Sequence, residues 1–466
     1  MDFWQIVLDW LKNLFGLDLL LGAIEAGEPI PAQAYLNLIF SSVTLILGVL
    51  VAYKTVYLVL GVFGKSRKYP SQPKTNRYMF VTSARNEEKV IGNWIDSVRA
   101  MDYPQELIDI YVLCDNCTDK TEEIAKSKGA KVYNHVNPNE RRKGFGLRHL
   151  FKTLKEEGMD IEKEYFAIVI FDADNVPAPK FLEKLNDAMV SGNFDECVGY
   201  RNTKNMAENW IAALCGMNAY AHVINGQRPR SILNTNQEIY GCGLCLRSHL
   251  LKDGWNWTGL TEDVDMMVDL AAKGCRTGYA EEAVFYEEQP TKFKQFLRQQ
   301  MRWTKGGLMS FNKYAWPITK SFFKKPSWGK YDMYWQFFPY ALATFYFSLS
   351  YQVISLILLL AVGEHGYHWW SFANFILTTF GGIYVSMLVM DLLTIIREWK
   401  HFHLNIAKTF AYLLLFPLYN VVSLPINAVS AFMKVEWKAI EHHYVADPKD
   451  LVKEEEEKAQ SHQKEN

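Results

Sequence analysis

Long apolar runs flank a central segment of mixed composition in this chain of 466 residues. Residues 34–64 are almost uniformly apolar, and the runs within residues 331–433 are long enough for further spans. A bilayer core of ~30 Å needs about 20 apolar residues in a helix, so these runs predict transmembrane helices. Basic residues, among them Arg67 and Lys68, follow the first run directly. By the positive-inside rule we therefore predict a multi-pass protein of the cell (inner or plasma) membrane, with a cytosolic central domain.

The two ends of the chain differ from these runs. Residues 1–26 mix apolar and charged positions, which predicts an amphipathic helix in the membrane interface and a candidate docking element for an accessory secretion partner. Two prolines, Pro417 and Pro425, interrupt the last apolar run, so a single kinked span and a hairpin both remain open. Residues 434–466 are expected to form a cytosolic interface segment and a charged tail.

Residues 76–310 have the composition of a soluble α/β domain. Short β-rich runs, such as Ile110 to Leu113 and Phe166 to Phe171, alternate with helical stretches. This alternation predicts a largely parallel sheet covered by helices on both faces. Because ligands of such sheets bind at the carboxyl ends of the strands, the polar clusters that follow these runs are the candidate site.

Carboxylates follow two of the predicted strands. Asp115 ends one apolar run, and Asp172 and Asp174 follow the uncharged run that ends at Phe171. Two carboxylates this close repel each other unless a cation lies between them, and hard divalent ions prefer oxygen ligands. The pattern favours a divalent-cation site, although a turn with two solvated aspartates gives the same sequence.

Two further clusters lie later in the chain. Glu262 and Asp263 follow an aromatic, Gly-rich run that contains Trp257. Rings stack on sugars and a carboxylate accepts a hydroxyl proton, so this run suits a sugar acceptor; a helix N-cap is the alternative. Gln299 and Arg302 share one face of a predicted helix, where arginine can bind a diphosphate. An amphipathic interface helix gives the same pattern.

The composition excludes some classes of protein. With 50 basic and 51 acidic residues, nothing points to nucleic acid. The seven cysteines, an odd number, do not indicate a disulfide framework. Two CxxC pairs, Cys114 with Cys117 and Cys242 with Cys245, match the spacing of a zinc site, and this reading remains an alternative.

Taken in order, the clusters resemble those of one known family. The motifs are Asp115, Asp172-Ala-Asp174, Thr261-Glu-Asp263 and Gln299-x-x-Arg302-Trp303. They look like the motifs of processive family 2 glycosyltransferases, which include cellulose, hyaluronan, chitin and poly-N-acetylglucosamine synthases. The likeness covers residues 76–310 in detail and the membrane segments in outline. It implies a Rossmann-like α/β domain of the GT-A type beside an α-helical transmembrane region.

The resemblance implies a donor site for a UDP-sugar. Asp115 would hold the uracil or ribose, and Lys143 matches the basic position near the nucleotide. Asp172 and Asp174 would place Mg²⁺ or Mn²⁺ on the diphosphate.

It also implies catalytic and acceptor residues. Asp263 would be the general base, Gln299 and Arg302 would steady the diphosphate, and Trp303 would stack on the acceptor sugar. The remaining acceptor residues would be Glu262, Trp257, and Gly241 and Cys242 of a Gly-rich loop.

The expected function is inverting, processive synthesis and membrane translocation of a β-linked polysaccharide, in the first place a β-glucan from UDP-glucose. A polymer made from UDP-N-acetylglucosamine is the first alternative. A non-processive transferase that moves one sugar onto a lipid phosphate is the second. A transporter or scaffold with a degenerate transferase domain is disfavoured, because every expected carboxylate is present.

Overall fold

The computed structural model describes residues 5, 9, 12, 15, 17–362, 369–402, 404–435 and 442–465. Much of the first part of the expected N-terminal helix, residues 1–16, and residues 436–441 of the expected C-terminal segment lie outside these described residues. The chain forms two compact units. One contains Met1–Val56 and Pro339–Met387, and the other contains Tyr57–Phe338 and Leu388–Asn466.

The first unit is helical. Its elements are α2 (Asp18–Ala26), α3 (Ala32–Val51), the start of α4 (Tyr53–Phe63), α15 (Tyr340–Val362) and the first part of α16 (Trp369–Glu398). α3 and α15 lie side by side, with the rings of Phe40 and Phe347 stacked at 5.1 Å between centroids. A polar contact joins the same helices, because Gln33 Nε2 donates to Ser355 Oγ at 3.0 Å. Burying this amide among apolar side chains without a partner would be costly, so the hydrogen bond fixes how the two helices meet.

Three helices in the described part of the chain are long and apolar enough to cross a membrane. They cover Ala32–Phe63, Tyr340–Ala361 and Ile376–His401. The last apolar run forms one helix, α17 (Ile406–Ser430), which continues through Pro417 and Pro425. The hairpin alternative for this run is therefore wrong.

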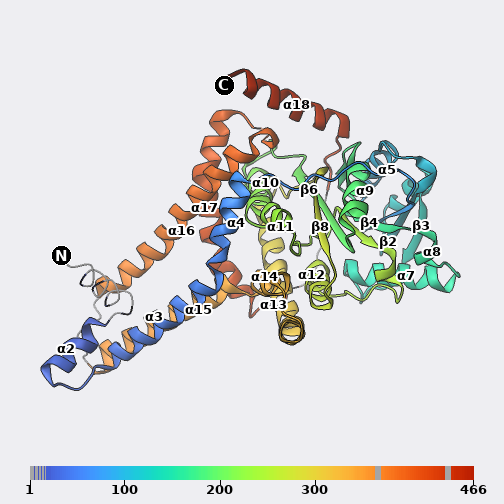
Figure 1. The fold of residues 1–466 in the computed structure, drawn as a ribbon. Helices are drawn as coiled ribbons and strands as arrows, with labels where there is room; N and C mark the ends of the chain where they lie inside the picture. Colours follow the sequence, from blue (N-terminus) through green and yellow to red (C-terminus); the bar gives the residue numbers. More distant parts are fainter. Residues whose placement is uncertain are drawn as a thin grey trace. The chain divides into compact units, whose positions relative to one another are not determined.

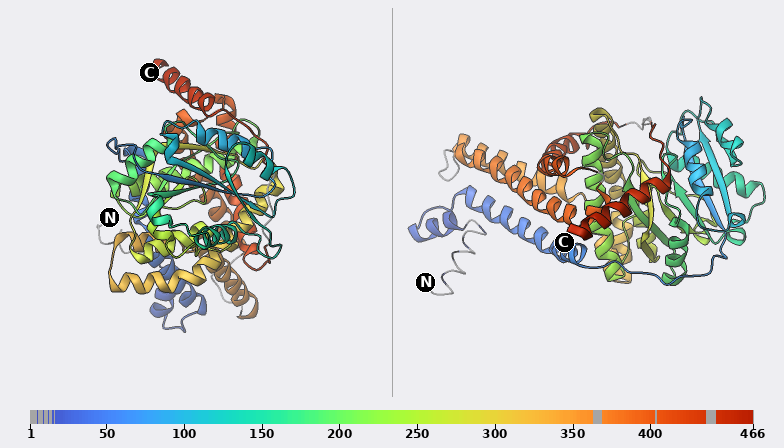
Figure 2. Two further views of the ribbon diagram at one scale, coloured as in Figure 1. Left: turned by 90° about the vertical axis from the view of Figure 1, so that its right-hand side faces the viewer. Right: turned by 90° about the horizontal axis from the view of Figure 1, so that it is seen from above.

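The second unit contains an eight-stranded sheet. Figure 1 and Figure 2 show its strands with helices packed around them. The strands are β1 (Tyr78–Ala84), β2 (Ile108–Asp115), β3 (Lys131–His135), β4 (Ala167–Phe171), β5 (Val176–Pro177), β6 (Glu196–Thr203), β7 (Leu244–Arg247) and β8 (Thr277–Glu287). Their order is β3-β2-β1-β4-β7-β6-β8-β5. β7 is antiparallel to β4 and β6, and β5 is antiparallel to β8, whereas the other neighbours are parallel.

Helices cover both faces of this sheet, as expected from the alternating sequence. The helices are α5 (Ile91–Arg99), α6 (Thr121–Ser127) and α9 (Phe181–Gly192) on one face, and α7 (Lys143–Glu156), α10 (Trp210–His222) and α12 (Glu262–Lys273) on the other. Strand β4 packs on both faces and all five of its residues are buried, which explains its uncharged run. The sheet confirms the predicted α/β fold.

The strand directions gather the polar clusters at one edge of the sheet. β2, β4, β6 and β8 all point the same way, so their carboxyl ends lie together. Asp115 ends β2, Asp172 follows β4, Lys204 follows β6 and Glu287 ends β8. Residues that are distant in sequence are thus brought to one place by the backbone alone.

Most of the remaining elements of this unit follow β8. They are α13 (Phe293–Lys324), α14 (Trp328–Phe337), the end of α16, α17 and α18 (Pro448–Glu465). The end of α4 and the short helices α8 (Ile161–Glu164) and α11 (Arg228–Leu233) precede β8 and complete the unit. α13 packs on α12, α14 and α17. The compact unit therefore extends beyond the expected domain of residues 76–310 on both sides.

Candidate active site

A cavity of about 480 Å³ opens at the carboxyl edge of the sheet. Strand ends form one side of it, and α12, α13 and α14 form the other. The residues expected from the sequence that line it are Asp115, Lys143, Asp172, Asp174, Gly241, Cys242, Glu262, Asp263, Gln299, Arg302 and Trp303. Of the site residues expected from the sequence, Trp257 does not line this cavity.

Asp115 lies at the end of the cavity formed by β2 and β3. Its carboxylate accepts from Arg85, and His135 Nδ1 lies 2.9 Å from its Oδ1. Arg85 Nε also donates to the Asp115 carbonyl oxygen at 2.9 Å. The Asp115 side chain is buried, and its carboxylate contacts both Arg85 and His135. It therefore holds these two side chains in place at this end of the cavity.

Lys143 brings a positive charge to the start of α7. Its Nζ lies 2.5 Å from Asp172 Oδ1 and also donates to the carbonyl oxygen of Gly241. Burial alone would lower the pKa of Lys143, but the carboxylates of Asp172 and Glu262 raise it, so the amine stays charged. The helix N-terminus adds partial positive charge at the same point, which suits an anion such as a diphosphate.

A glycine allows this helix to start where it does. A Cβ atom on Gly144 would lie 2.3 Å from the carbonyl oxygen of Trp257. Any larger residue would push the start of α7, and Lys143 with it, away from the cavity.

Asp174 lies deeper than Asp172. Its Oδ2 accepts from the backbone N–H of Glu288 at 2.9 Å, and its carbonyl oxygen accepts from Lys204 Nζ at 2.7 Å. Glu87 and Glu287 line the same part of the cavity, and the pKa of each is raised, first by burial and then by the charges of Asp174 and Asp172.

This excess of carboxylates fits a divalent cation. Within the described residues, no three His, Cys, Asp or Glu side chains are grouped closely enough to hold a metal by themselves. Asp172 and Asp174 would therefore supply only some of the ligands, and the phosphate oxygens of a donor would supply others.

The C-terminal segment reaches this end of the cavity, which the sequence did not predict. His442 lines the cavity, and its Nδ1 lies 3.0 Å from Glu87 Oε1. Burial would lower the pKa of His442, but Asp174, Glu87 and Glu288 raise it to about 10, so the imidazole is protonated at neutral pH.

Backbone contacts hold this segment against the catalytic domain. The N–H of Tyr444 donates to Glu288 Oε2 at 2.9 Å, and the Tyr444 carbonyl oxygen accepts from Lys204. Asn93 exchanges hydrogen bonds with the backbone of Ala446. No local sequence pattern marks His442, because it reaches the site only through contacts between distant parts of the chain. Lys204 directly follows β6, a strand that was not among the predicted runs.

Glu262 and Asp263 begin α12 on the opposite side of the cavity. Within the first turn of this helix, the N–H of Val264 donates to Asp263 Oδ1 at 2.9 Å. Burial and the neighbouring Asp263 raise the pKa of Glu262 to about 7, and burial also raises the pKa of Asp263. A Cβ atom on Gly241 would lie 3.5 Å from a carboxylate oxygen of each, so the glycine leaves room beside both carboxylates.

α13 carries Gln299, Arg302 and Trp303 to the cavity. Arg302 Nη1 donates to the carbonyl oxygen of Leu260 at 3.4 Å, and the ring of Trp303 is 37% exposed. The helix approaches this loop closely at Gly306, where a Cβ atom would lie 2.4 Å from the Thr261 side chain.

A second cavity of about 50 Å³ adjoins this helix. It shares Gln299 and Trp303 with the main cavity and reaches Tyr419 of α17. Asn218 of α10 lines both cavities. The end of the main cavity beside Trp303 thus continues between α10, α13 and α17.

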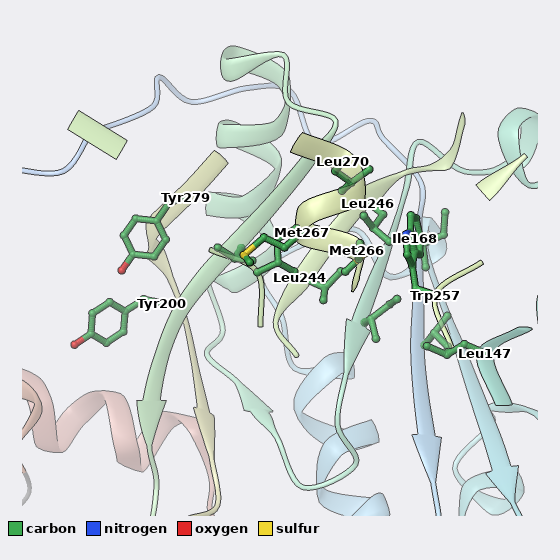
Figure 3. Close-up of a cluster of buried hydrophobic side chains, with 14 of the residues drawn as sticks. Leu147, Ile168, Tyr200, Leu244, Leu246, Trp257, Met266, Met267, Leu270 and Tyr279 are labelled. Atoms are coloured by element: carbon green, nitrogen blue, oxygen red, sulfur yellow. The ribbon is translucent and has the colours of Figure 1, made fainter. Parts of the chain in front are cut away.

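The expectation that Trp257 binds the acceptor is wrong. Its ring is 3% exposed and lies among buried apolar side chains, as Figure 3 shows. Its Nε1 donates to Asp269 Oδ2 at 3.0 Å, and Trp255 lies edge-on at 5.1 Å. The ring therefore packs against α12 and not into the cavity.

The zinc alternative is not supported either. Cys245 lies within β7 opposite Cys197, and Cys242 faces Glu287, whereas Cys114 and Cys117 lie at the end of β2. The described residues contain no cluster that would unite the two pairs around a metal.

Comparison with known protein families gives two overlapping matches. Residues 79–254 match the model described as Glycosyl transferase family 2, and residues 167–390 match Glycosyl transferase family group 2.

Individual relatives match about half of this chain. It is 26% identical over 258 residues to the Probable glucomannan 4-beta-mannosyltransferase 14 of Arabidopsis thaliana, covering 51% of this chain and 46% of that protein. It is 26% identical over 253 residues to the Beta-monoglucosyldiacylglycerol synthase of a Synechocystis strain, covering 52% of this chain and 50% of that protein. The chain thus spans about half the length of these curated relatives.

A solved structure gives a further, weaker likeness. The mannosyltransferase PcManGT from Pyrobaculum calidifontis, in complex with GDP-Man and Mn²⁺, aligns with a TM-score of 0.48 and 12% identity. The alignment covers 84% of this chain and 99% of that one.

Proposed function

We propose that this glycosyltransferase, which carries a family 2 domain, builds a β-linked polysaccharide from a nucleotide sugar at the cytosolic face of a membrane. One observation carries the proposal. A single cavity contains the Asp172 and Asp174 pair, the carboxylate of Asp263, and the side chains of Arg302 and Trp303. These are the groups needed to bind a diphosphate, take a proton from an acceptor and hold a sugar ring.

The donor diphosphate would lie between Lys143 at the start of α7 and Arg302 on α13. Both side chains line the cavity from opposite sides, and both are positively charged. Asp172 and Asp174 would hold Mg²⁺ or Mn²⁺, which would neutralise charge on the leaving diphosphate. Asp115 and the residues it holds, Arg85 and His135, would form the nucleoside end.

Asp263 would act as the general base. Burial raises its pKa, which makes the ionised carboxylate a stronger proton acceptor than an exposed aspartate. The acceptor hydroxyl loses its proton to Asp263, and its oxygen forms a bond to the anomeric carbon as the bond to the diphosphate breaks. Attack from the side opposite the leaving group inverts the configuration, so an α-linked donor gives a β-linked product.

The acceptor end supports a polymer product. The exposed ring of Trp303 offers a stacking surface, and the smaller cavity continues from it towards Tyr419. Gln300 Nε2 donates to the Tyr419 hydroxyl at 3.2 Å, which holds α13 and α17 together along this path. A growing chain would leave the site in this direction.

UDP-glucose is the proposed donor and a β-glucan the proposed product. The name of one relative, a probable glucomannan 4-beta-mannosyltransferase, makes a nucleotide-activated mannose a necessary competitor, and UDP-N-acetylglucosamine is another. Purified full-length protein should be given each donor in turn, and the release of nucleoside diphosphate and the length of the product measured. If none of the donors gave release of nucleoside diphosphate above background, the result would contradict a transferase. A product extended by a single sugar would contradict processive synthesis.

A second candidate is transfer of one hexose to a membrane lipid. It is favoured by three helices that could span a membrane and by the relative named as a glucosyldiacylglycerol synthase. Thin-layer chromatography of labelled product separates the two, because a glycolipid migrates with the organic phase and a polysaccharide stays at the origin.

A further inference from the structure

The segment from Gln289 to Tyr331 contains no acidic residue. It contains ten basic residues, in a chain whose formal net charge is −1. Almost all of it forms α13, whose first half carries the active-site residues and whose second half lies beyond the cavity. The charge of this second half is not explained by the catalytic site.

The second half of α13 exposes an unusual stripe. Met309, Trp316 and Phe323 are spaced by seven residues and share one exposed face, and Trp316 and Phe323 are 72% and 77% exposed. The opposite face, with Ser310 and Ile318, is buried against α12 and α14. The exposed face of α13 is therefore available for a contact outside this chain.

Lysines stand beside these rings. Lys320 and Lys324 lie on the exposed face, and Lys325 follows the end of the helix. In the described residues no carboxylate pairs with any of the three, whereas Lys313 of the preceding turn is held by Asp265 at 3.1 Å. Three unpaired cations beside two exposed aromatic rings form a surface with one sign of charge.

Exposed aromatic rings and lysines on the same face indicate whether this helix meets water, lipid tails or lipid headgroups. A helix in water would not expose two large aromatic rings so fully, and a helix immersed in lipid tails would not carry lysines on the same face. An amphipathic helix in the headgroup region does both, since its rings enter the boundary and its lysines meet phosphates.

A hydrogen bond within this unit joins the start of α14 to a candidate membrane span. Trp328, which begins α14 just after α13, donates from Nε1 to the hydroxyl of Tyr57 at 2.9 Å. Tyr57 belongs to the candidate span Ala32–Phe63 and lies near its end. Basic residues follow that span, as expected for a segment beside an anionic leaflet.

We infer that the second half of α13, residues 309–325, binds the surface of a leaflet rich in anionic phospholipid. Trp316 and Phe323 anchor it, and Lys320, Lys324 and Lys325 select negatively charged headgroups. The inference rests on the membrane location of the chain, not on the identity of its sugar donor.

The test is lipid binding by the full-length protein purified in detergent. Native mass spectrometry would count phosphatidylglycerol and phosphatidylcholine molecules retained by the wild type and by a triple variant with Lys320, Lys324 and Lys325 changed to Gln. Each lysine near an anionic surface is worth about a fivefold change in affinity, so the triple variant should retain far less phosphatidylglycerol. Binding of phosphatidylcholine should not change.

Two control variants keep the result specific. A triple variant with Lys→Arg at the same positions should bind phosphatidylglycerol as the wild type does. A matched triple variant, Lys152→Gln, Lys155→Gln and Lys163→Gln, changes the net charge equally on an exposed part of α7 and α8 and should also bind normally.

Three results would overturn the inference. The first is equal retention of phosphatidylglycerol by the wild type and the Gln variant at Lys320, Lys324 and Lys325. The second is an equal loss in the variant at Lys152, Lys155 and Lys163, which would show an effect of net charge alone. The third is full competition by soluble glycerol phosphate, which would show a free anion site and not a lipid surface.

Discussion

The substitution Asp263→Asn removes a charge from the cavity while leaving the local contacts in place. The N–H of Val264 donates to Asp263 Oδ1, and the amide oxygen of asparagine can accept the same hydrogen bond. Loss of a negative charge at the start of α12 costs about 0.3–1 kcal/mol through the helix dipole. We therefore expect the variant to fold and to unfold at nearly the same temperature as the wild type.

The loss of catalysis should be much larger. A positioned general base contributes about 10²–10⁴-fold to a rate, or about 3–5 kcal/mol of barrier. The donor diphosphate is expected beside Lys143 and Arg302, so UDP affinity should stay within about threefold. Turnover is measured by coupled detection of released UDP, and affinity by titration calorimetry.

Glu262→Gln is the matched control, because it changes the adjacent carboxylate. Because the proposal assigns proton transfer to Asp263, loss of the Glu262 carboxylate should cost less than about tenfold. Burial raises the pKa of Asp263, so the acid limb of kcat/KM should lie above the usual aspartate range, with activity rising as the pH increases. If Asp263→Asn keeps more than a tenth of the rate, or Glu262→Gln loses as much, the base is wrongly assigned.

Other predictions concern the metal, the acceptor and the stability of the fold. Asp174→Asn, or excess EDTA, should lower sugar transfer roughly a hundredfold or more, because the leaving diphosphate loses its counter-charge; full turnover in EDTA would exclude the proposed metal. Trp303→Ala should shorten the polymer and weaken acceptor binding about fivefold, while Trp303→Phe keeps both; normal chain length in the alanine variant would remove this ring from the site. Glu196 is fully buried, neither of its carboxylate oxygens has a hydrogen-bond partner in the described residues, and burial raises its pKa well above the usual range. The folded state therefore holds a proton that the unfolded state loses, so stability is complete below the unfolded pKa and falls by about 1.4 kcal/mol per pH unit above it. Glu196→Gln should raise the unfolding temperature at pH 8 and have little effect near pH 4; an equal effect at both would refute this account.

The sequence predicted most of the site because strand ends leave a local signal. Asp115 and Asp172 each follow an uncharged run, and parallel strands bring such ends together whatever the details of the loops. Trp257 was misplaced because an aromatic residue beside glycines looks the same whether its ring faces a cavity or the core. Only the packing around it, with Asp269 accepting from its indole, decides between them.

The site residues that the sequence did not predict were missed for a different reason. His442 follows the last apolar run by many residues and meets Glu87, about 350 positions earlier in the chain, only in the folded protein. A contact between residues so far apart in the sequence leaves no pattern in any short stretch of it. Lys204 is different, because it follows the carboxyl end of β6 as Asp172 follows β4, although its hydrogen-bond partners lie after β4 and near the C-terminus.

The contact between His442 and Glu87 also bears on how this protein is made. Among the residues that line the cavity, His442 is translated after every candidate span, whereas Glu87 is translated early. A nascent chain that has folded its sheet, but has not yet completed its later helices, lacks this residue of the lining. The order of synthesis thus delays completion of the cavity lining until the later helices have been made, and a catalytic fragment expressed without its C-terminal segment lacks the contact between His442 and Glu87.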